Sequence, residues 1–187
     1  HCKDYAQAMR DYAACTLQQV EHAASDHVIS KEDLADTRRG SICARTLFML
    51  SAFGQDLVIP STVLAHSTTK KLEALSIDIV VIHNDLVSYA KEVNEGVEHN
   101  RILNLQKQDM TFQDARDHLL DQAQDAIAKL FDDDNIVESQ CLRSQESVGS
   151  PSQCVEFKEY VNILRLIPRV NLHWSFICRR FVLEDGS

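Results

Sequence analysis

The sequence predicts an all-α fold, an antiparallel bundle of long helices, from three observations. Glycine and proline are scarce, with 5 and 3 residues among 187, so the chain has few of the residues that separate short strands. Apolar residues recur at helical intervals of three and four positions in several stretches. A strict alternation of apolar and polar residues, which is typical of a half-buried strand, is not evident.

Three helix starts are predicted in the first part of the chain. Residues 3–25 form an Ala-rich stretch with apolar side chains at helical intervals. The sequence Ser-Lys-Glu-Asp at 30–33 resembles a capping box, which opens a helix that runs towards Gly54. Pro60, with the Ser-Thr pair that follows it, marks the next start, because proline is favoured in the first turn of a helix.

Two further helices are predicted around Gly96 and Thr111. The first ends at Gly96 and carries an apolar stripe of the kind that packs against neighbouring helices: Leu72, Leu75, Ile79, Ile82, Leu86 and Tyr89. Thr111 and Asp114 form a second capping box. The buried face of the helix that follows is predicted to be Ala115, Leu119, Ala123, Ile127 and Leu130.

The last part of the chain combines a loop with a long helix. Residues 132–152 are acidic and then rich in serine and glutamine, which predicts a flexible surface loop. The acidic run at 132–138 is interpreted as a solvated turn and not as a metal site. A final helix is predicted over residues 155–181, with a kink at Pro168.

The composition limits the class of function. A formal charge of −9 argues against a nucleic-acid partner or an anionic membrane partner, because both need a surplus of Lys and Arg. No apolar run approaches the ~20 residues that span a membrane. Six scattered cysteines without a CxxC pair favour reduced thiols in a cytoplasmic protein. The oligomeric state is left open.

The stretch NDLVSYAKE, residues 84–92, carries the polar groups with the clearest chemistry. Asn84, Ser88 and Glu92 are spaced by four residues, so they lie along one face of a helix over two turns. An amide oxygen, a hydroxyl and a carboxylate suit a hard divalent cation such as Mg²⁺. Lys91 adds a point charge for a phosphate shared with that cation. A solvated polar face is the alternative, since such polar ladders are common.

The residues before this ladder favour the metal hypothesis. Ile77 and Val81 fall within about 60° of Asn84 on a helical projection, so the face is apolar for two turns before it becomes polar. The stripe from Leu72 to Leu86 points roughly the other way and is also apolar. A helix that is apolar on both sides belongs inside a bundle, and its polar ladder is then expected to open onto a cavity with hydrocarbon walls.

The same stretch resembles the second metal-binding motif of class I terpene synthases, (N/D)DxxSxxxE, at all four specified positions. It is most similar to the form NDxxSxxKE that is frequent in fungal and other microbial sesquiterpene cyclases. Three further stretches resemble family segments in the family's order. They are ADTRRGSICAR (35–45, the segment of the diphosphate-sensing arginine), VEHNRILNL (97–105, the start of the next helix) and NLHWSFICRRF (171–181, the NxxWSxxxxRY element).

This resemblance implies roles for individual residues. The expected metal ligands are Asn84, Ser88 and Glu92. The expected diphosphate-binding residues are Arg38, Lys91 and Arg180. Arg38 lies 46 residues before Asn84, a separation typical of the diphosphate sensor, and Arg39 is the alternative for that role. Phe181 replaces the tyrosine of the family element, so the hydroxyl that would reach the diphosphate is absent.

The resemblance also implies a reaction. In this family three Mg²⁺ ions, with Mn²⁺ as a substitute, and cationic side chains hold a prenyl diphosphate, here expected to be farnesyl diphosphate. Loss of the diphosphate leaves a carbocation that cyclises in an apolar pocket, which makes the enzyme a carbon–oxygen lyase. The expected pocket wall is Ile77, Val81, Trp174, Phe176 and Phe181. The terpene product and the length of the substrate chain are not specified by the sequence.

A second family motif, D(D/E/N)xx(D/E), has no counterpart at its usual place. In full-length members it lies well over a hundred residues before the NDxxSxxxE motif, and only 83 residues precede Asn84 here. We therefore expect residues 1–187 to be the C-terminal part of a single catalytic domain, an incomplete bundle with little activity by itself. The alternative is a non-catalytic, degenerate α-helical protein that binds a partner.

Overall fold

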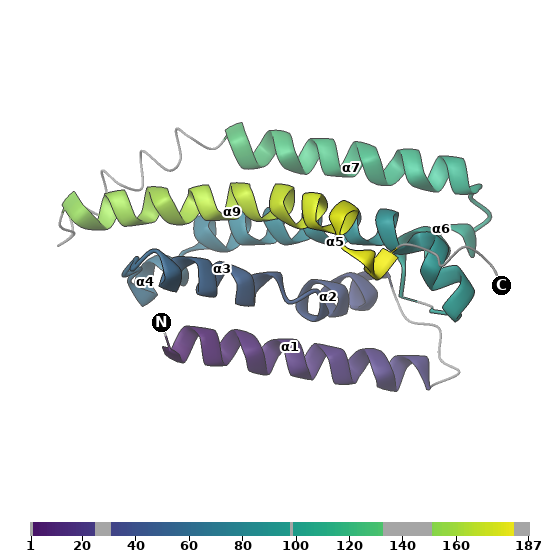
Figure 1. Cartoon of the computed structure of the whole chain (residues 1–187), viewed down its shortest axis with the longest axis horizontal. Coiled ribbons are helices and arrows are strands. Elements are labelled where there is room, and N and C mark those ends of the chain that lie inside the picture. Colours follow the sequence, from purple (N-terminus) through teal and green to yellow (C-terminus); the bar gives the residue numbers. More distant parts are fainter. Residues whose placement is uncertain (1, 25–30, 98, 133–150, 182–187) are drawn as a thin grey trace.

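The computed structural model describes residues 2–24, 31–97, 99–132 and 151–181, and within these ranges every regular element is a helix. The all-α class is confirmed (Figure 1). The α-helices, followed by one short 3₁₀ helix, are α1 (Cys2–Ala23), α2 (Lys31–Ser41), α3 (Ala44–Gly54), α4 (Ser61–Leu64), α5 (Ser67–Glu95), α6 (Arg101–Gln106), α7 (Phe112–Asp132), α9 (Pro151–Ile177) and η1 (Arg179–Phe181).

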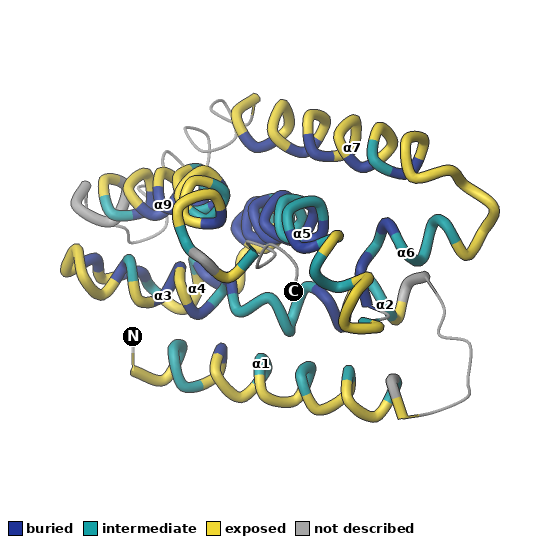
Figure 2. The backbone as a smooth tube through the Cα atoms, turned by 45° about the vertical axis from the view of Figure 1, so that its right-hand side comes forward, coloured by how far each residue is buried: buried dark blue, intermediate teal, exposed yellow. Residues whose placement is uncertain are grey.

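Helix α5 is the centre of the bundle. It packs against α2, α3, α6, α7 and α9, and in Figure 2 it runs buried through the middle while α1 and α7 expose their outer faces. Four consecutive residues, 79–82, are buried. Because successive residues of a helix point 100° apart, four in a row cover every side of it. The helices α3 and α7 run antiparallel to α5, and α9 runs parallel to it (Figure 1).

Both ends of α5 are set by local sequence. The Nδ1 atom of His66 accepts a hydrogen bond from the backbone N–H of Thr68 at 3.2 Å and caps the first turn. The start predicted at Pro60 belongs to the separate short helix α4. Gly96 ends α5 as predicted, in the left-handed conformation with φ 67°, which glycine adopts without a Cβ clash.

The single helix predicted from residue 30 towards Gly54 is wrong, because the chain breaks it into α2 and α3. Cys43 lies between them in the left-handed region, with φ 63°. One residue in this conformation turns the chain out of the helical path, and hydrogen bonding resumes as Leu47 N–H donates to the Cys43 carbonyl. The break leaves Arg38 and Arg39 in the last turn of α2, beside α5.

Gly40 allows α1 to approach α2 closely. A Cβ atom built at Gly40 would lie 2.1 Å from the Sγ atom and 2.7 Å from the Cβ atom of Cys15 on α1. These separations are far below van der Waals contact, so a larger residue would push the two helices apart. The absence of a side chain at Gly40 therefore allows the short distance between α1 and α2.

The remaining helix boundaries agree with the predicted signals at α7 and differ from them at the last helix. The backbone N–H of Asp114 donates to Thr111 Oγ1 at 3.1 Å, which confirms the capping box before α7. The last α-helix starts earlier and ends earlier than predicted, and it includes Pro168. Of the loop predicted at 132–152, the two ends belong to α7 and α9, and residues 133–150 lie outside the described residues.

Two apolar clusters fill the bundle. The larger lies mainly between α3, α5 and α9, and the smaller joins α5 to α6 and α7. The predicted buried face of α7 is confirmed except at Ile127, whose side chain is 38% exposed. Ala126 is buried in its place, because the spacing of four, four, three and four residues from Ala115 to Leu130 passes through position 126. Within the described residues, no helix is both long and apolar enough to cross a membrane.

A buried polar contact crosses the larger cluster. The Tyr160 hydroxyl on α9 donates a hydrogen bond to the Glu73 carboxylate on α5 at 2.5 Å, and Arg45 Nε on α3 lies 3.4 Å from the same carboxylate. Burial raises the pKa of Glu73, while the Tyr160 hydrogen bond and the Arg45 charge oppose that shift. The contact ties three helices together at a charged group that is almost fully buried.

Replacing Glu73 by Gln is expected to remove a pH dependence of stability. Because the pKa of Glu73 is raised on folding, the folded protein holds this proton more tightly than the unfolded chain, whose carboxyl titrates near 4.5. Its contribution to the unfolding free energy therefore falls as pH rises above about 4.5. Urea titrations at several pH values should show Glu73→Gln gaining stability relative to the unmodified protein towards neutral pH. A pH-independent difference would contradict the raised pKa.

Candidate functional site

The C-terminal half of α5 presents the ladder of oxygen-bearing side chains that the sequence predicts. Asn84, Ser88 and Glu92 follow one another at intervals of one turn. Ser88 is buried, with a side chain that is 1% exposed, and the other two residues are half-buried. The ladder therefore lies at the edge of the bundle interior and does not form a fully solvated face.

Each member of the ladder has a defined partner. Asn84 Oδ1 accepts a hydrogen bond from Arg38 Nη2 at 3.2 Å. The Ser88 hydroxyl donates to the Asn84 backbone carbonyl at 2.7 Å, which leaves both lone pairs of Oγ available. Glu92 Oε2 accepts from Asn100 Nδ2 at 2.8 Å, so one of its two oxygens is held. These contacts orient the three oxygens without using all of their acceptor capacity.

Arg38 reaches the ladder through a buried ion pair. Its guanidinium pairs with the Asp85 carboxylate, which is fully buried next to Asn84 on α5. The other Asp85 oxygen accepts from the Arg101 backbone N–H at 3.3 Å and lies 4.0 Å from Arg101 Nε. Burial raises the pKa of Asp85, and the charges of both arginines oppose that shift. Asp85 is thus a structural anchor for Arg38, one position from the ladder.

Arg39, the alternative sensor, points to a different side of α5. Its guanidinium forms two hydrogen bonds with the Asp78 carboxylate, at 2.7 and 2.8 Å. Because Asp78 lies six residues before Asn84, its side chain is about 120° away around the helix. The structure therefore places Arg38 beside the ladder and Arg39 away from it.

The other two predicted diphosphate contacts lie near α5 with local partners. Lys91 Nζ is 3.6 Å from the Glu95 carboxylate, one turn further along α5. Arg180 is exposed and its guanidinium lies 5.5 Å from the centre of the Phe181 ring. The η1 helix that carries Arg180 packs against α5. Among the described contacts, neither cation is bonded to the ladder.

The predicted pocket wall falls into two groups. Ile77 and Val81 are buried in the larger apolar cluster. Trp174 and Phe176 are 45% and 73% exposed, near the end of α9, and Trp174 meets Phe181 edge to face with ring centres 6.4 Å apart. The second group is therefore an aromatic surface, whereas the first is enclosed by the protein's own helices.

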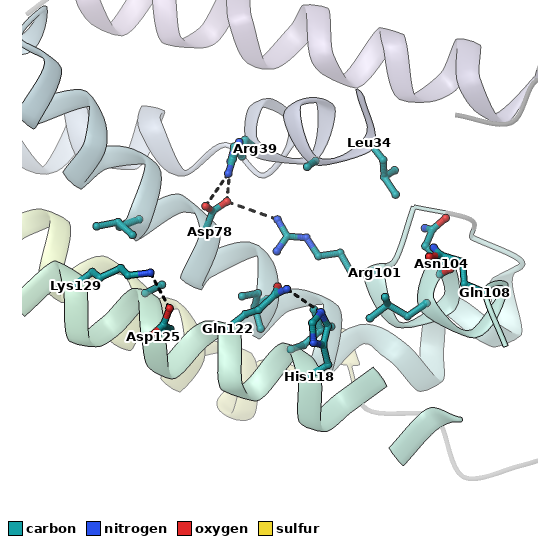
Figure 3. A pocket seen from close by; sticks show the side chains of 16 residues that line it. Leu34, Arg39, Asp78, Arg101, Asn104, Gln108, His118, Gln122, Asp125 and Lys129 are labelled. Carbon is teal, nitrogen blue, oxygen red and sulfur yellow. Dashed lines mark hydrogen bonds and ion pairs between the residues drawn. The ribbon is translucent and has the colours of Figure 1, made fainter. Parts of the chain in front are cut away.

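A cleft of about 500 Å³ opens between α2, α5, α6 and α7, and Leu75, Asp78 and Ile82 are the residues of α5 that line it. Figure 3 shows Asp78 in its wall, bonded to Arg39 and facing Arg101, whose Nη2 lies 3.6 Å from Asp78 Oδ1. Further along, Gln122 contacts His118 at 2.9 Å. The sequence pattern did not reveal this cleft, because its walls come from four separate helices.

Two residues that contact the ladder or its neighbour Asp85 are not predicted by the sequence patterns. Asn100 and Arg101 stand at the start of α6 and contact Glu92 and Asp85, respectively. The sequence feature that contains both residues is the segment VEHNRILNL at 97–105, whose resemblance to the family indicates only the start of a helix. Spacing alone could not show that this short helix folds back against the end of α5.

The ladder passes a test of fit for a divalent cation. It combines an amide oxygen, a hydroxyl and a carboxylate, and each keeps at least one lone pair outside the contacts described above. Within the described ranges, no group of three or more His, Cys, Asp or Glu side chains is arranged to hold a metal ion. A cation site built on α5 would thus depend on the mixed oxygen set and not on a cluster of acids.

Comparison with known proteins identifies relatives. Residues 1–129 match the family model described as terpene synthase family 2, C-terminal metal binding. Cycloaraneosene synthase from Sordaria araneosa is 30% identical over 159 residues, which are 84% of this chain and 41% of that protein. Terpene cyclase 4 from Gibberella fujikuroi is 30% identical over 177 residues, or 94% of this chain and 46% of that protein. The chain spans about half the length of these curated relatives.

Solved structures show the same fold. The α-eudesmol synthase structure superposes with a TM-score of 0.80 at 16% identity, covering 93% of this chain and 55% of that one. The complex of hedycaryol synthase with nerolidol gives a TM-score of 0.78 at 14% identity, covering 92% and 57%. At these identities the likeness concerns the helical arrangement, and the match again extends over about half of the longer chains.

Removing the charge of Asp85 is expected to destabilise the fold strongly. Asp85→Asn leaves Arg38 without its buried counter-charge and Arg101 with Asp78 alone, and breaking a buried pair typically costs about 3–5 kcal/mol. Asp125→Asn is the matched control, because its ion pair with Lys129 on α7 is exposed and such pairs contribute up to about 1 kcal/mol. Urea denaturation measures both. Equal losses for the two variants would show that Asp85 is not an anchor.

Proposed function

Because this chain belongs to terpene synthase family 2, we propose that it forms the diphosphate-binding part of a terpene cyclase catalytic domain. The observation that carries the proposal is the contact between Arg38 and Asn84. Two stretches that resemble the family's diphosphate sensor and its metal motif are 46 residues apart, and the fold brings them within hydrogen-bond distance.

The proposed division of work follows the side-chain chemistry. In this proposal Asn84, Ser88 and Glu92 supply oxygen ligands, and Arg38, which donates a hydrogen bond to Asn84, also donates to a diphosphate oxygen. When bound there, a divalent cation, in our proposal Mg²⁺, supplies positive charge that stabilises the leaving diphosphate. Lys91 on α5 and Arg180 on η1, which packs against α5, are further proposed diphosphate contacts.

We infer a prenyl diphosphate as the substrate, with farnesyl diphosphate as the specific proposal. Two relatives are described as sesquiterpene synthases, and one of them, from Postia placenta, is 25% identical over 186 residues. In this chain, Trp174 and Phe176 offer exposed aromatic surface near η1. Aromatic faces stabilise a carbocation without reacting with it, provided that water is kept out.

The extent of the chain shapes the experiment. Relatives extend over about twice its length, so residues 1–187 by themselves are expected to release little or no diphosphate from farnesyl diphosphate. Turnover is expected from the protein that is encoded by the longest reading frame containing these residues. Diphosphate release and volatile products, measured for both forms with Mg²⁺, test this. The non-catalytic alternative gains support if neither form reacts.

Replacing Glu92 by Gln is expected to lower turnover in the longer form by at least about a hundredfold, because the ladder loses its one negative charge. Glu159→Gln on the exposed face of α9 is the matched control and should retain full activity. The assay is diphosphate release under saturating farnesyl diphosphate. If Glu92→Gln and Glu159→Gln were equally active, Glu92 would have no role in the reaction.

A second pair of variants separates the two neighbouring arginines. Arg38→Gln is expected to reduce the rate about a hundredfold or more, since it removes a charged donor beside the ladder and also breaks the buried pair with Asp85. Arg39→Gln removes a contact to Asp78 on another side of α5 and should reduce the rate far less. The ratio of the two kcat/KM values is the measurement. A larger loss for Arg39→Gln would reverse our assignment of the sensor.

A further inference from the structure

We propose that Asn100 is a positioning residue that holds the Glu92 carboxylate in the oxygen ladder. This inference rests on the proposed function, since it concerns how one of the proposed ligands is kept in place. Asn100 lies at the start of α6, eight residues after Glu92, and its side chain is fully buried. Its contacts connect the cap of one helix to the functional end of another.

The Asn100 side chain uses both of its polar atoms. Its Nδ2 group donates to Glu92 Oε2 at 2.8 Å and to the Asp85 backbone carbonyl at 2.8 Å. Its Oδ1 atom accepts from the Ile102 backbone N–H at 2.9 Å. A backbone N–H can only donate, so this last contact fixes which side-chain atom is oxygen and which is nitrogen. The two donors of Nδ2 must therefore face α5.

The two acceptors on α5 are arranged for a single amide. Asp85 and Glu92 are seven residues apart, which is almost two full turns, so they lie on the same side of the helix. The Asp85 carbonyl fixes where Nδ2 sits, and Nδ2 in turn fixes one oxygen of Glu92. The two hydrogen bonds of Nδ2, here called the bridge, connect Asp85 to Glu92 near the C-terminal end of α5. This helix ends at Glu95, and helix ends are the parts most prone to fraying.

A neutral donor suits this task. An arginine or lysine in the same place would neutralise the Glu92 carboxylate and compete with a bound cation. The amide holds Oε2 in position and leaves the full negative charge on the group. Partners of this kind orient metal ligands in proteins, and their loss typically weakens metal affinity about 10- to 100-fold.

A capping role alone makes a different prediction. Asn100 is the N-cap of α6, and serine is about as good a cap as asparagine. Serine is too short to reach Glu92 from the same backbone position. Asn100→Ser therefore separates the two roles: it keeps the cap and removes the bridge.

The test measures Mn²⁺ binding to the 187-residue chain by electron paramagnetic resonance, for the unmodified protein, Asn100→Ser, Glu92→Gln and the double variant. We expect Asn100→Ser to raise the Kd about tenfold or more. We also expect the double variant to be little weaker than Glu92→Gln, because Asn100 acts through Glu92. Asn162→Ser, which removes an exposed Asn–Glu contact on α9, is the matched control and should bind normally.

The outcomes are distinguishable. If Glu92→Gln weakens binding and Asn100→Ser does not, the positioning role is overturned and the proposed function stands. If the unmodified chain and Glu92→Gln bind Mn²⁺ equally poorly or equally well, the ladder is no metal site, and both proposals fall. If Asn100→Ser does not fold, nuclear magnetic resonance replaces it: Glu92→Ala should shift the side-chain amide signals of Asn100, and unchanged signals would refute the bridge.

Discussion

The buried pair between Arg38 and Asp85 is the interaction on which the rest of the site depends. It joins the last turn of α2 to the middle of α5, and it places a guanidinium beside Asn84. Buried charges are costly unless they are paired, so this contact constrains the direction in which the chain leaves α2. The left-handed residue Cys43 follows at once and sends α3 back along α5. The fold and the site share this one constraint.

Helix α5 separates two chemically different regions. On one side, amide, hydroxyl and carboxylate oxygens form the ladder next to Arg38. On another, Arg39, Asp78 and Arg101 line a cleft beside α7 (Figure 3). Arg101 belongs to both regions, because its backbone N–H contacts Asp85 while its guanidinium faces Asp78. The short helix α6 therefore couples the ladder to the cleft wall.

Sequence patterns predicted what depends on local chemistry. The apolar spacing, the Thr111 cap and the Gly96 terminus are properties of a few neighbouring residues, and they predicted α5 and α7 well. The break at Cys43 was missed, since the nearby Gly40 lies within α2 and the left-handed residue itself is a cysteine. Asn100 was missed for a related reason: its partner Glu92 is close in space only because the chain reverses after Gly96. The roles of the ladder residues themselves stay predictions.

The most direct test of the central claim is the anomalous diffraction signal of Mn²⁺ soaked into crystals of this chain. Our account predicts a peak within coordination distance, about 2.0–2.3 Å, of oxygens from Asn84, Ser88 and Glu92. Asn100 should remain bonded to the other Glu92 oxygen. A peak in the cleft at Asp78, with none at an accessible ladder, would contradict the account.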